Sequence, residues 1–255
     1  MTEIKQLYSL LKNNEAFAFN RFSDGEYYII NNQYLEIAHK KVKVGQNHVN
    51  NSYAKFDFKV FDPLKHQANR DRLIQAFTFN QKNYFKGFMC KCCTSRHNYK
   101  NQFKLLTKYN GKRSDFDLSS NLLINGNYLK FRKEILPLIL SKDYVIVAHQ
   151  SASLRKFRPI KAFKLGYNSF IEEMHKIQEI ANWIEANKIS NTIFLLSGSS
   201  WAKVAIHELY LKFPQNTYID IGTALNHDFE MPTNRGYLNE YYGKGIKDIN
   251  RLCSI

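Results

Sequence analysis

The sequence predicts an α/β fold: a single Rossmann-like domain in which crossover helices connect the strands of a mainly parallel sheet. Short apolar runs alternate along the 255 residues with longer segments of helical spacing, which is the pattern that βαβ units produce. No internal repeat and no Pro- or Ser-rich linker divides the chain, and 44% hydrophobic residues can fill one large core. We therefore expect one domain over residues 1–255, with residues 34–62 as a possible insert over the functional site.

The chain opens with a predicted helix and a buried strand. Ile4, Leu7 and Leu11 repeat at helical spacing, which predicts an amphipathic helix at the N-terminus. Residues 17–19 are an apolar run followed by a turn and a helix-compatible run, so we expect a buried strand there. Residues 34–60 are polar and aromatic with some alternation, which is typical of a short edge strand or of an inserted loop.

The remaining elements alternate between apolar runs and segments of helical spacing. We predict further strands at residues 84–90, 144–148, 193–196 and 218–222. We predict further helices at residues 63–77, 103–109, 117–140, 170–186 and 201–213, the third of them interrupted at Asn125-Gly126-Asn127-Tyr128. Parallel strands joined in this way end at one edge of the sheet, so a ligand site is expected in the loops that leave them.

Two carboxylates, Asp24 and Glu26, follow the first strand on either side of Gly25. At the carboxyl end of a strand they are suited to hold one hard divalent cation, which would bridge to a phosphate. The alternative is that Asp24 caps the following helix, with Ser23 or Glu26 completing its first turn. The residue pattern by itself leaves both interpretations open.

Two further loops carry groups that bind phosphate. Ser197-Gly198-Ser199-Ser200 lies between a buried strand and a helix, where backbone N–H groups and the helix dipole favour an anion. It matches neither the Walker A nor the Gly-x-Gly-x-x-Gly pattern, so it does not identify a nucleotide. Residues 149–158 combine a histidine, hydroxyls and cations such as Arg155, and suit a pyrophosphate contact or a solvated basic loop. The polar segment 223–237 follows the last strand and is expected to fold over the site.

The formal net charge of +15 predicts attraction to polyanions such as nucleic acid, an anionic membrane surface or phosphorylated small molecules. The cations are spread along the chain, with local density only at residues 155–158. A dedicated nucleic-acid binder gathers them on one face. We therefore expect weak, sequence-blind binding and no specific nucleic-acid partner, although 15% aromatic residues keep a nucleic-acid-binding protein as an alternative.

The four cysteines do not follow the paired pattern of a secreted disulfide scaffold. Cys90, Cys92 and Cys93 with nearby His97 suggest zinc, but adjacent ligands suit tetrahedral zinc poorly and a second pair is missing, so we expect reduced structural thiols. Charged residues interrupt the first 14 positions. We accordingly expect no signal peptide, no membrane span and a cytoplasmic protein.

The segment Arg21-Phe22-Ser23-Asp24-Gly25-Glu26 resembles the Arg-Phe-Gly-Asp-Gly-Glu signature of the GT-D-type glycosyltransferases, a family once known only as a domain of unknown function. The sequence departs from that signature at Ser23, where the family usually has glycine. Three further segments resemble the family in the same order along the chain, namely residues 125–128, the loop 197–200 and Asp220-Ile221-Gly222. The likeness spans most of the chain and implies a single GT-D-like domain.

This resemblance implies a metal-dependent glycosyltransferase that moves a sugar from a nucleoside diphosphate donor, usually UDP-linked, to a glycan, glycoprotein or other hydroxyl acceptor. It implies Mn²⁺ or Mg²⁺ at Asp24 and Glu26. With the phosphate-binding loops above, it places the donor at Arg21, Asn127, Arg155, Ser197, Gly198, Ser199, Ser200 and Asp220.

An inverting reaction would also need a base for the acceptor hydroxyl, and Asp228 and Glu230 are candidates by position only. A retaining reaction would need no base in that role. Because similar sheets carry other nucleotide-cofactor enzymes, a transferase such as a methyltransferase is a further alternative. The oligomeric state stays open.

Overall fold

The fold is built on a seven-stranded sheet with the strand order β7-β6-β1-β11-β10-β8-β9, in which every neighbouring pair is parallel. The computed structural model describes residues 2–38, 41–49, 58–111, 117–233 and 235–244. The strands of this sheet are β1 (Ala18–Arg21), β6 (Tyr84–Phe88), β7 (Asp117–Ser119), β8 (Tyr144–His149), β9 (Lys161–Leu165), β10 (Ile193–Leu196) and β11 (Thr217–Asp220). The predicted α/β class with a mainly parallel sheet is confirmed.

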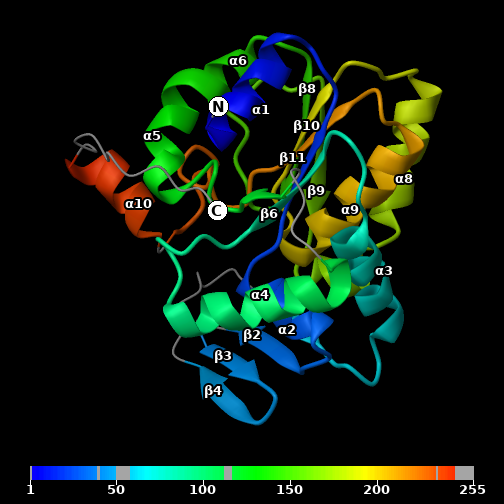
Figure 1. Cartoon of the computed structure of the whole chain (residues 1–255). Helices are drawn as coiled ribbons and strands as arrows, with labels where there is room; N and C mark the ends of the chain where they lie inside the picture. The colour runs from blue at the N-terminus through cyan, green and yellow to red at the C-terminus, as the bar shows by residue number, and fades with distance from the viewer. Residues whose placement is uncertain (1, 39–40, 50–57, 112–116, 234, 245–255) are drawn as a thin grey trace.

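Helices cover both faces of the sheet (Figure 1). One face carries α1 (Glu3–Lys12), α5 (Tyr128–Lys130) and α6 (Leu136–Leu140), and the other carries α3 (Gln67–Thr78), α8 (Lys176–Ala186) and α9 (Ser199–Lys212). The shorter or peripheral helices are α2 (Asp24–Ile30), α4 (Arg96–Asn110), α7 (Ser169–Glu172), α10 (Gly236–Asn239), a 3-10 turn at Asn125–Asn127 and π-helical turns at Phe131–Ile135 and Glu240–Lys244. In the described part of the chain, no helix combines the length and the apolar character that crossing a membrane requires.

Burial explains why the central strands could be predicted. All four residues of β1, β10 and β11 are buried, because helices cover both faces of the parallel sheet, and β10 is apolar throughout. Among the helices, α8 buries one face, whereas α9 buries ten of its 14 residues. The α9 helix contacts α3, α7, α8, β1 and β11, so it is the most enclosed helix and positions the site at its N-terminus.

The predicted insert is a second sheet. Strands β2 (Leu35–Ala38), β3 (Lys41–Val44), β4 (Asn47–Val49) and β5 (Lys59–Phe61) pair antiparallel in the order β4-β3-β2-β5. It lies at the lower end of the molecule in Figure 1, next to α2 and α4. Buried Leu35, Ile37 and Phe61 belong to the same apolar cluster as α3 and α9, so this small sheet shares the core of the main sheet. Residues 39–40 and 50–57 of the predicted insert lie outside the described residues.

Several predicted boundaries were wrong. Residues 117–119, expected to begin a helix, form β7, whose three residues pair with β6. Strand β9 was not predicted, because its residues are mostly half-exposed and two of its five are lysines. Helix α4 begins at Arg96 rather than near residue 103, and α3 begins at Gln67 rather than at Pro63.

The strand order reverses next to β1. From β1 the chain runs outward through β6 to β7, whereas β8 to β11 lie on the other side of β1. Ligands of open α/β sheets bind at such a switch point, outside the carboxyl ends of the strands. The loops that follow β1 and β11 are therefore the place where a site is expected.

Candidate functional site

A cavity of about 420 Å³ opens at the carboxyl ends of the strands, within the size range of small-molecule sites. All seven strands of the main sheet contribute to its lining, either through their last residue or through the loop that follows. These residues are Arg21 and Asp24 at the end of and after β1, Met89 and Cys93 after β6, Ser120 after β7, His149 of β8, Tyr167 after β9, Ser197 to Ser199 after β10, and Gly222 and Thr223 after β11. The small sheet contributes Ile37 and Lys59. The cavity thus lies at the predicted edge of the sheet.

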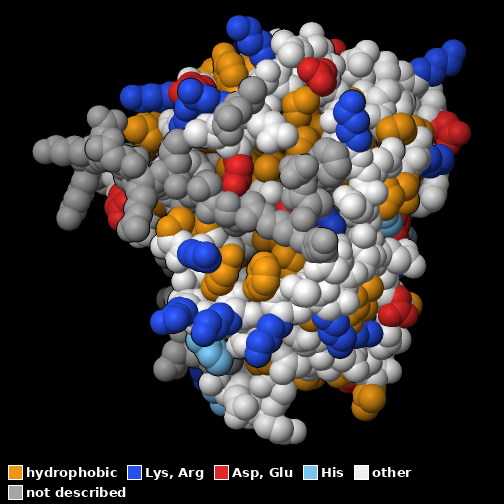
Figure 2. Space-filling view, viewed as in Figure 1, with side chains coloured by type: hydrophobic (Ala, Val, Ile, Leu, Met, Phe, Trp, Pro, Cys, Tyr) orange, Lys and Arg blue, Asp and Glu red, His pale blue; other side chains and the backbone are white. Residues whose placement is uncertain are grey.

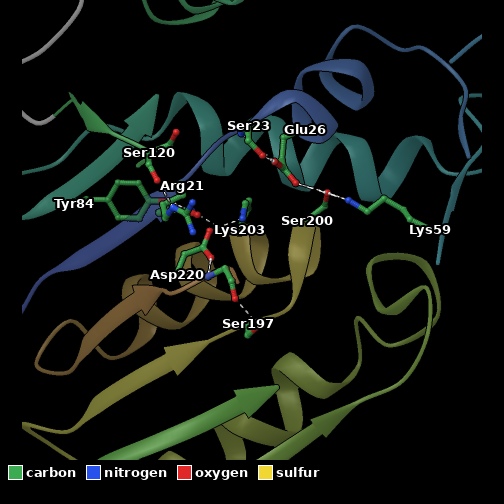
Figure 3. Close-up of polar contacts among 12 residues, drawn as sticks. Arg21, Ser23, Glu26, Lys59, Tyr84, Ser120, Ser197, Ser200, Lys203 and Asp220 are labelled. Carbon is green, nitrogen blue, oxygen red and sulfur yellow. Dashed lines mark hydrogen bonds and ion pairs between the residues drawn. The ribbon is translucent and has the colours of Figure 1, made fainter. Parts of the chain in front are cut away.

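Glu26 is the centre of a buried hydrogen-bond network at one wall of the cavity (Figure 3). Its Oε2 accepts the backbone N–H of Ser23 at 3.1 Å and the Ser23 hydroxyl at 3.0 Å. Its Oε1 accepts the Ser200 hydroxyl at 2.6 Å and lies 3.9 Å from Nζ of Lys59. Lys59 in turn donates to the Ser200 hydroxyl at 2.7 Å. The carboxylate therefore caps α2 and also joins that helix to α9 and β5.

The network changes the acidity of Glu26. Burial by itself would raise the pKa of this carboxyl, but the positive charges of Lys203 and Lys59 and the hydrogen bonds from Ser200 and Ser23 outweigh it and lower the pKa to about 2. Glu26 is thus a fixed anion whose two oxygens both accept hydrogen bonds.

Asp24, the first residue of α2, lines the cavity and behaves in the opposite way. Burial and the negative charge of Glu26 raise the pKa of its carboxyl, and Arg235, the Gly25 N–H and Lys59 compensate only in part. An anion that its surroundings leave undercompensated gains from an added cation. Asp24 is consequently the carboxylate of the pair that is suited to receive a ligand.

Arg21 and Lys203 bring positive charge to the floor of the cavity. Lys203 forms a buried ion pair with Asp220, and Asp220 also accepts the backbone N–H of Gly222 at 2.9 Å. Arg21 donates through Nε to the carbonyl of Ser120. Gly222 has a φ of +48°, and a Cβ there would overlap Nη1 of Arg21, so the glycine is required both by its backbone conformation and by the guanidinium beside it.

The loop before α9 is held tightly. The Ser197 hydroxyl donates to the Gly222 carbonyl at 2.8 Å, and Ser199 adopts a left-handed φ of +50°, which is strained for a residue with a side chain. A Cβ on Gly198 would lie 2.7 Å from Cδ1 of Leu165 and 3.1 Å from Cε3 of Trp201. Gly198 is therefore needed for packing between β9 and α9, in addition to any contact with a ligand.

Not every predicted residue lies at the cavity. Ser197, Gly198, Ser199, Asp24, Glu26 and Arg21 line it, whereas Ser200 and Asp220 are buried behind it in the contacts described above. Asn127 is buried and donates to the Asn121 carbonyl at 3.3 Å, and its neighbour Asn125 lines the cavity instead. The structure thus does not bring Asn127 to the cavity surface.

The predicted base and basic-loop residues are also separated from the cavity. Asp228 forms an ion pair with Arg132, and the exposed side chains of Glu230 and Arg155 pair with each other at 2.6 Å. None of Asp228, Glu230 and Arg155 is among the described residues that line the cavity. Their positions after the last strand and in a basic loop suggested the site, but each of these charges is ion-paired with a side chain that is also not among the described lining residues.

The structure adds residues that the sequence pattern did not single out. Lys59 comes from the small sheet and Lys203 from inside α9, and Arg235 lies in the predicted polar segment, of which Thr223, Asn226, Met231 and Tyr237 also line the cavity. Lysine and arginine are common on any protein surface. These three cations stand out from the others only because the fold brings them to the same cavity as Asp24 and Glu26.

His149 at the end of β8 also lines the cavity. Burial lowers the pKa of its imidazole, with Glu173 and Lys164 acting in opposite directions. The backbone N–H of Ser151 donates to Nδ1 at 3.2 Å, so the neutral ring carries its proton on Nε2. His149 is thereby suited to donate a hydrogen bond rather than to act as a base.

Comparison with known proteins identifies the fold. No protein-family model matches the sequence, and no curated protein matches it. Two solved structures of domain of unknown function 1792, one of them described as having a distinct glycosyltransferase fold and the other a selenomethionine-substituted form, superpose with TM-scores of 0.55 and 0.56. This chain has that glycosyltransferase fold. The alignments cover 96% of this chain and 88% of each structure at 17% and 16% identity, so the likeness concerns the glycosyltransferase fold and not the donor, acceptor or metal.

Proposed function

We propose that the protein is a metal-dependent glycosyltransferase that transfers a sugar from a nucleoside diphosphate donor, UDP-linked in our expectation, to a glycan or another hydroxyl acceptor. The observation that supports this most is the position of Asp24, an undercompensated carboxylate in a cationic cavity at the switch point of a glycosyltransferase fold. A diphosphate needs this combination of a carboxylate that can hold a cation and direct positive charge from the protein.

The proposed diphosphate position lies between the floor and the start of α9. Arg21, Lys59, Lys203 and Arg235 line the cavity, against two carboxylates among the described lining residues. The first N–H groups of α9 have no carbonyl partner within the helix and carry the positive end of its dipole. Charge that develops on a departing diphosphate would be stabilised by these groups without reorganisation of solvent.

The donor set of the cavity fits one hard cation held mainly by Asp24. Both oxygens of Glu26 already accept hydrogen bonds, and Lys59 lies beside it. Asp24 also lines the cavity, but its raised pKa means that its surroundings disfavour the ionised carboxylate. Mg²⁺ and Mn²⁺ are commonly bound by one or two carboxylates together with substrate phosphates. When bound, such an ion would neutralise diphosphate charge, and Glu26 would position Ser200 and Lys59 around it.

The acceptor is proposed to enter past two aromatic rings. Phe58 and Tyr167 line the cavity and are 41% and 48% exposed. Exposed aromatic side chains at a cavity mark binding surfaces, and their apolar faces match those of a sugar ring. The segments that carry them are joined, since Asn168 donates its backbone N–H to the Phe58 carbonyl at 3.3 Å and accepts the Val60 N–H at 3.1 Å.

Calorimetric binding of UDP and UDP-sugars, with and without Mn²⁺, tests the proposal. We expect binding that requires the metal, that Asp24→Asn abolishes without lowering the melting temperature, and that Asp71→Asn on the exposed side of α3 leaves unchanged. Equal binding in the presence and absence of Mn²⁺, or metal-dependent binding that survives Asp24→Asn, would contradict the metal role. Binding of S-adenosylmethionine, or a tight and sequence-selective oligonucleotide complex without sugar-nucleotide binding, would overturn the proposed activity.

A further inference from the structure

Three cysteine side chains converge in the loop between β6 and α4. Cys90 is buried, Cys92 and Cys93 are exposed, and their sulfur atoms all lie within 4.8 Å of one another. The Cys90 and Cys92 sulfurs are 3.0 Å apart, and those of Cys92 and Cys93 are 3.7 Å apart. The proposed glycosyltransferase reaction assigns no task to this cluster, although Cys93 also lines the cavity.

We propose that Cys90, Cys92 and Cys93 form a three-thiolate site for one soft d¹⁰ metal ion, of the class of Zn²⁺ or Cu⁺. Metal–sulfur bonds of about 2.3 Å place three sulfurs about 4 Å apart around a trigonal ion. Two of the separations in the structure, 3.0 Å and 3.7 Å, are shorter than that spacing, and all three are within 4.8 Å. Small rotations of the two exposed side chains are sufficient to admit the ion.

The ligand type separates this site from the cation position at Asp24. The cluster holds sulfur ligands alone, which select soft ions, whereas carboxylates select Mg²⁺ and Mn²⁺. Adjacent cysteines suit a closed tetrahedral zinc site poorly, but a three-coordinate ion needs only three converging sulfurs and leaves one position open.

The surroundings of the cluster favour thiolates. The Asn121 side-chain amide donates to the Cys90 sulfur at 3.3 Å, which is the kind of outer contact that orients metal ligands. Helix α4 begins just after the cluster with Ser95 as its N-cap, and the N-terminal end of a helix stabilises nearby negative charge. On binding, each coordinating thiol releases its proton to solvent, so binding acidifies an unbuffered solution.

Titration of the reduced full-length chain with Cd²⁺, an ion whose thiolate complexes absorb in the ultraviolet, tests the site. We expect one Cd²⁺ per chain, a thiolate-to-metal absorption band, displacement by Zn²⁺ and no displacement by Mg²⁺ or Mn²⁺. Cys92→Ser and Cys93→Ser should each weaken binding by more than about tenfold, because even outer contacts to metal ligands are worth that much. Cys253→Ser, a control outside the described residues, should bind like the unsubstituted protein.

The outcomes are independent of glycosyl transfer, because the titration uses no donor and no turnover. Absence of the band, its persistence in the Cys92→Ser, Cys93→Ser double variant, or its loss in Cys253→Ser would overturn the three-thiolate site. So would a Cys90–Cys92 disulfide in the isolated protein whose reduction does not restore Cd²⁺ binding.

Discussion

Two carboxylates in one turn of α2 respond to pH in opposite ways. The pKa of Glu26 is lowered to about 2, against burial, by two lysines and by hydrogen bonds, whereas burial and Glu26 raise the pKa of Asp24. Ionisation of Asp24 therefore destabilises the fold. The free energy of unfolding falls as the pH rises through the pKa that Asp24 has in the folded protein. Removing that charge in Asp24→Asn should consequently stabilise the protein at neutral pH, even though it abolishes the proposed metal binding.

Glu26→Gln should have the reverse effect. The depressed pKa means that ionised Glu26 stabilises the fold at pH values above about 4.5, and that this contribution is lost as the pH falls towards about 2. At about 1.4 kcal/mol for each unit of pKa difference between folded and unfolded chain, we expect the substitution to cost about 3 kcal/mol at neutral pH.

Urea unfolding of Glu26→Gln at several pH values between 2 and 7 would measure this cost, and the variant should show a flatter acid limb than the unsubstituted protein. Glu185→Gln removes an exposed partner of Lys212 and is the control, since exposed ion pairs contribute little. Equal acid limbs for the Glu26 variant and the unsubstituted protein would argue against a stabilising role of the network.

Gly222→Ala should displace Arg21. The new Cβ combines a left-handed φ with overlap of the guanidinium, so we expect a loss of more than about 1 kcal/mol in stability and weaker UDP binding. Gly45 is a matched control, because it has a φ of +58° and no atom of the described residues lies within 4 Å of an added Cβ. Gly45→Ala should lose only the stability that the left-handed backbone conformation costs an alanine. If UDP binding falls equally in both variants, Arg21 does not contribute to UDP binding.

At the level of single residues, the predicted residues that line the cavity are those that lie close together in sequence. Asp24 and Glu26 follow one strand, and Ser197 to Ser199 follow another, so a strand, a turn and a helix start were enough to suggest them. Lys59 and Lys203 reach Glu26 and Asp220 through contacts of tertiary structure. Asp228 and Glu230, which were chosen by their position after the last strand, pair with arginines from other segments and are not among the described residues that line the cavity.

The start of α9 combines backbone strain with the proposed phosphate position. Ser199→Gly should relieve the left-handed strain and stabilise the fold by about 1 kcal/mol, because that conformation costs a residue with a side chain about 1 to 2 kcal/mol. A glycine also loosens the loop, so we expect weaker UDP binding, measured by calorimetry alongside thermal unfolding. Ser199→Ala keeps the strain and should change both quantities little.

Lys188→Gly provides the comparison for this element. Lys188 has a similar φ of +52° after α8 and does not line the cavity, so its replacement should stabilise the fold without changing UDP binding. If Ser199→Gly behaves in the same way as Lys188→Gly, the strain at Ser199 is unrelated to the ligand.

Elements were predictable where burial on both faces makes a strand apolar throughout. That condition holds for β10 and for the first five residues of β8, whereas β1 was predicted from the apolar run at residues 17–19. It fails at the edges of the sheet, where β7 has three residues and β9 has two lysines among its five residues. The small sheet was foreseen only as an insert, because strands of three and four residues carry too little pattern to distinguish them from a loop.

For the whole molecule, positive charge is more concentrated than the sequence suggested. Figure 2 shows a row of lysine and arginine side chains across the face where α4 lies. Arg96, Lys100, Lys104 and Lys108 are four residues apart on that helix, which has no acidic residue, so they share one exposed face. This row was missed because the chain-wide count of cations does not reveal helical register.

The α4 row should govern weak polyanion binding and leave the cavity unaffected. We expect sequence-blind oligonucleotide binding, roughly micromolar or weaker at physiological salt and falling as salt rises. Lys100→Glu with Lys104→Glu should weaken it further without changing UDP binding.

Because Arg155 pairs with Glu230 outside the cavity, Arg155→Ala with Arg158→Ala should not reduce UDP binding, contrary to the expectation from sequence. Salt titrations of both ligands would check this, and a loss of UDP binding in the Arg155 pair would restore the earlier assignment.

The place of β11 in the sheet has a consequence for the order of events during synthesis. This strand lies between β1 and β10, so Ala18 near the start of the chain pairs with Tyr218 near its end, and Leu195 pairs with Ile219. Until β11 leaves the ribosome, no strand joins the β7-β6-β1 half of the sheet to the β10-β8-β9 half. Lys203 also lacks its ion-pair partner, Asp220, which lies on β11. Such long-range pairing is slow and comes late in folding. A nascent chain therefore cannot assemble the charged floor of the cavity before β11 has been translated.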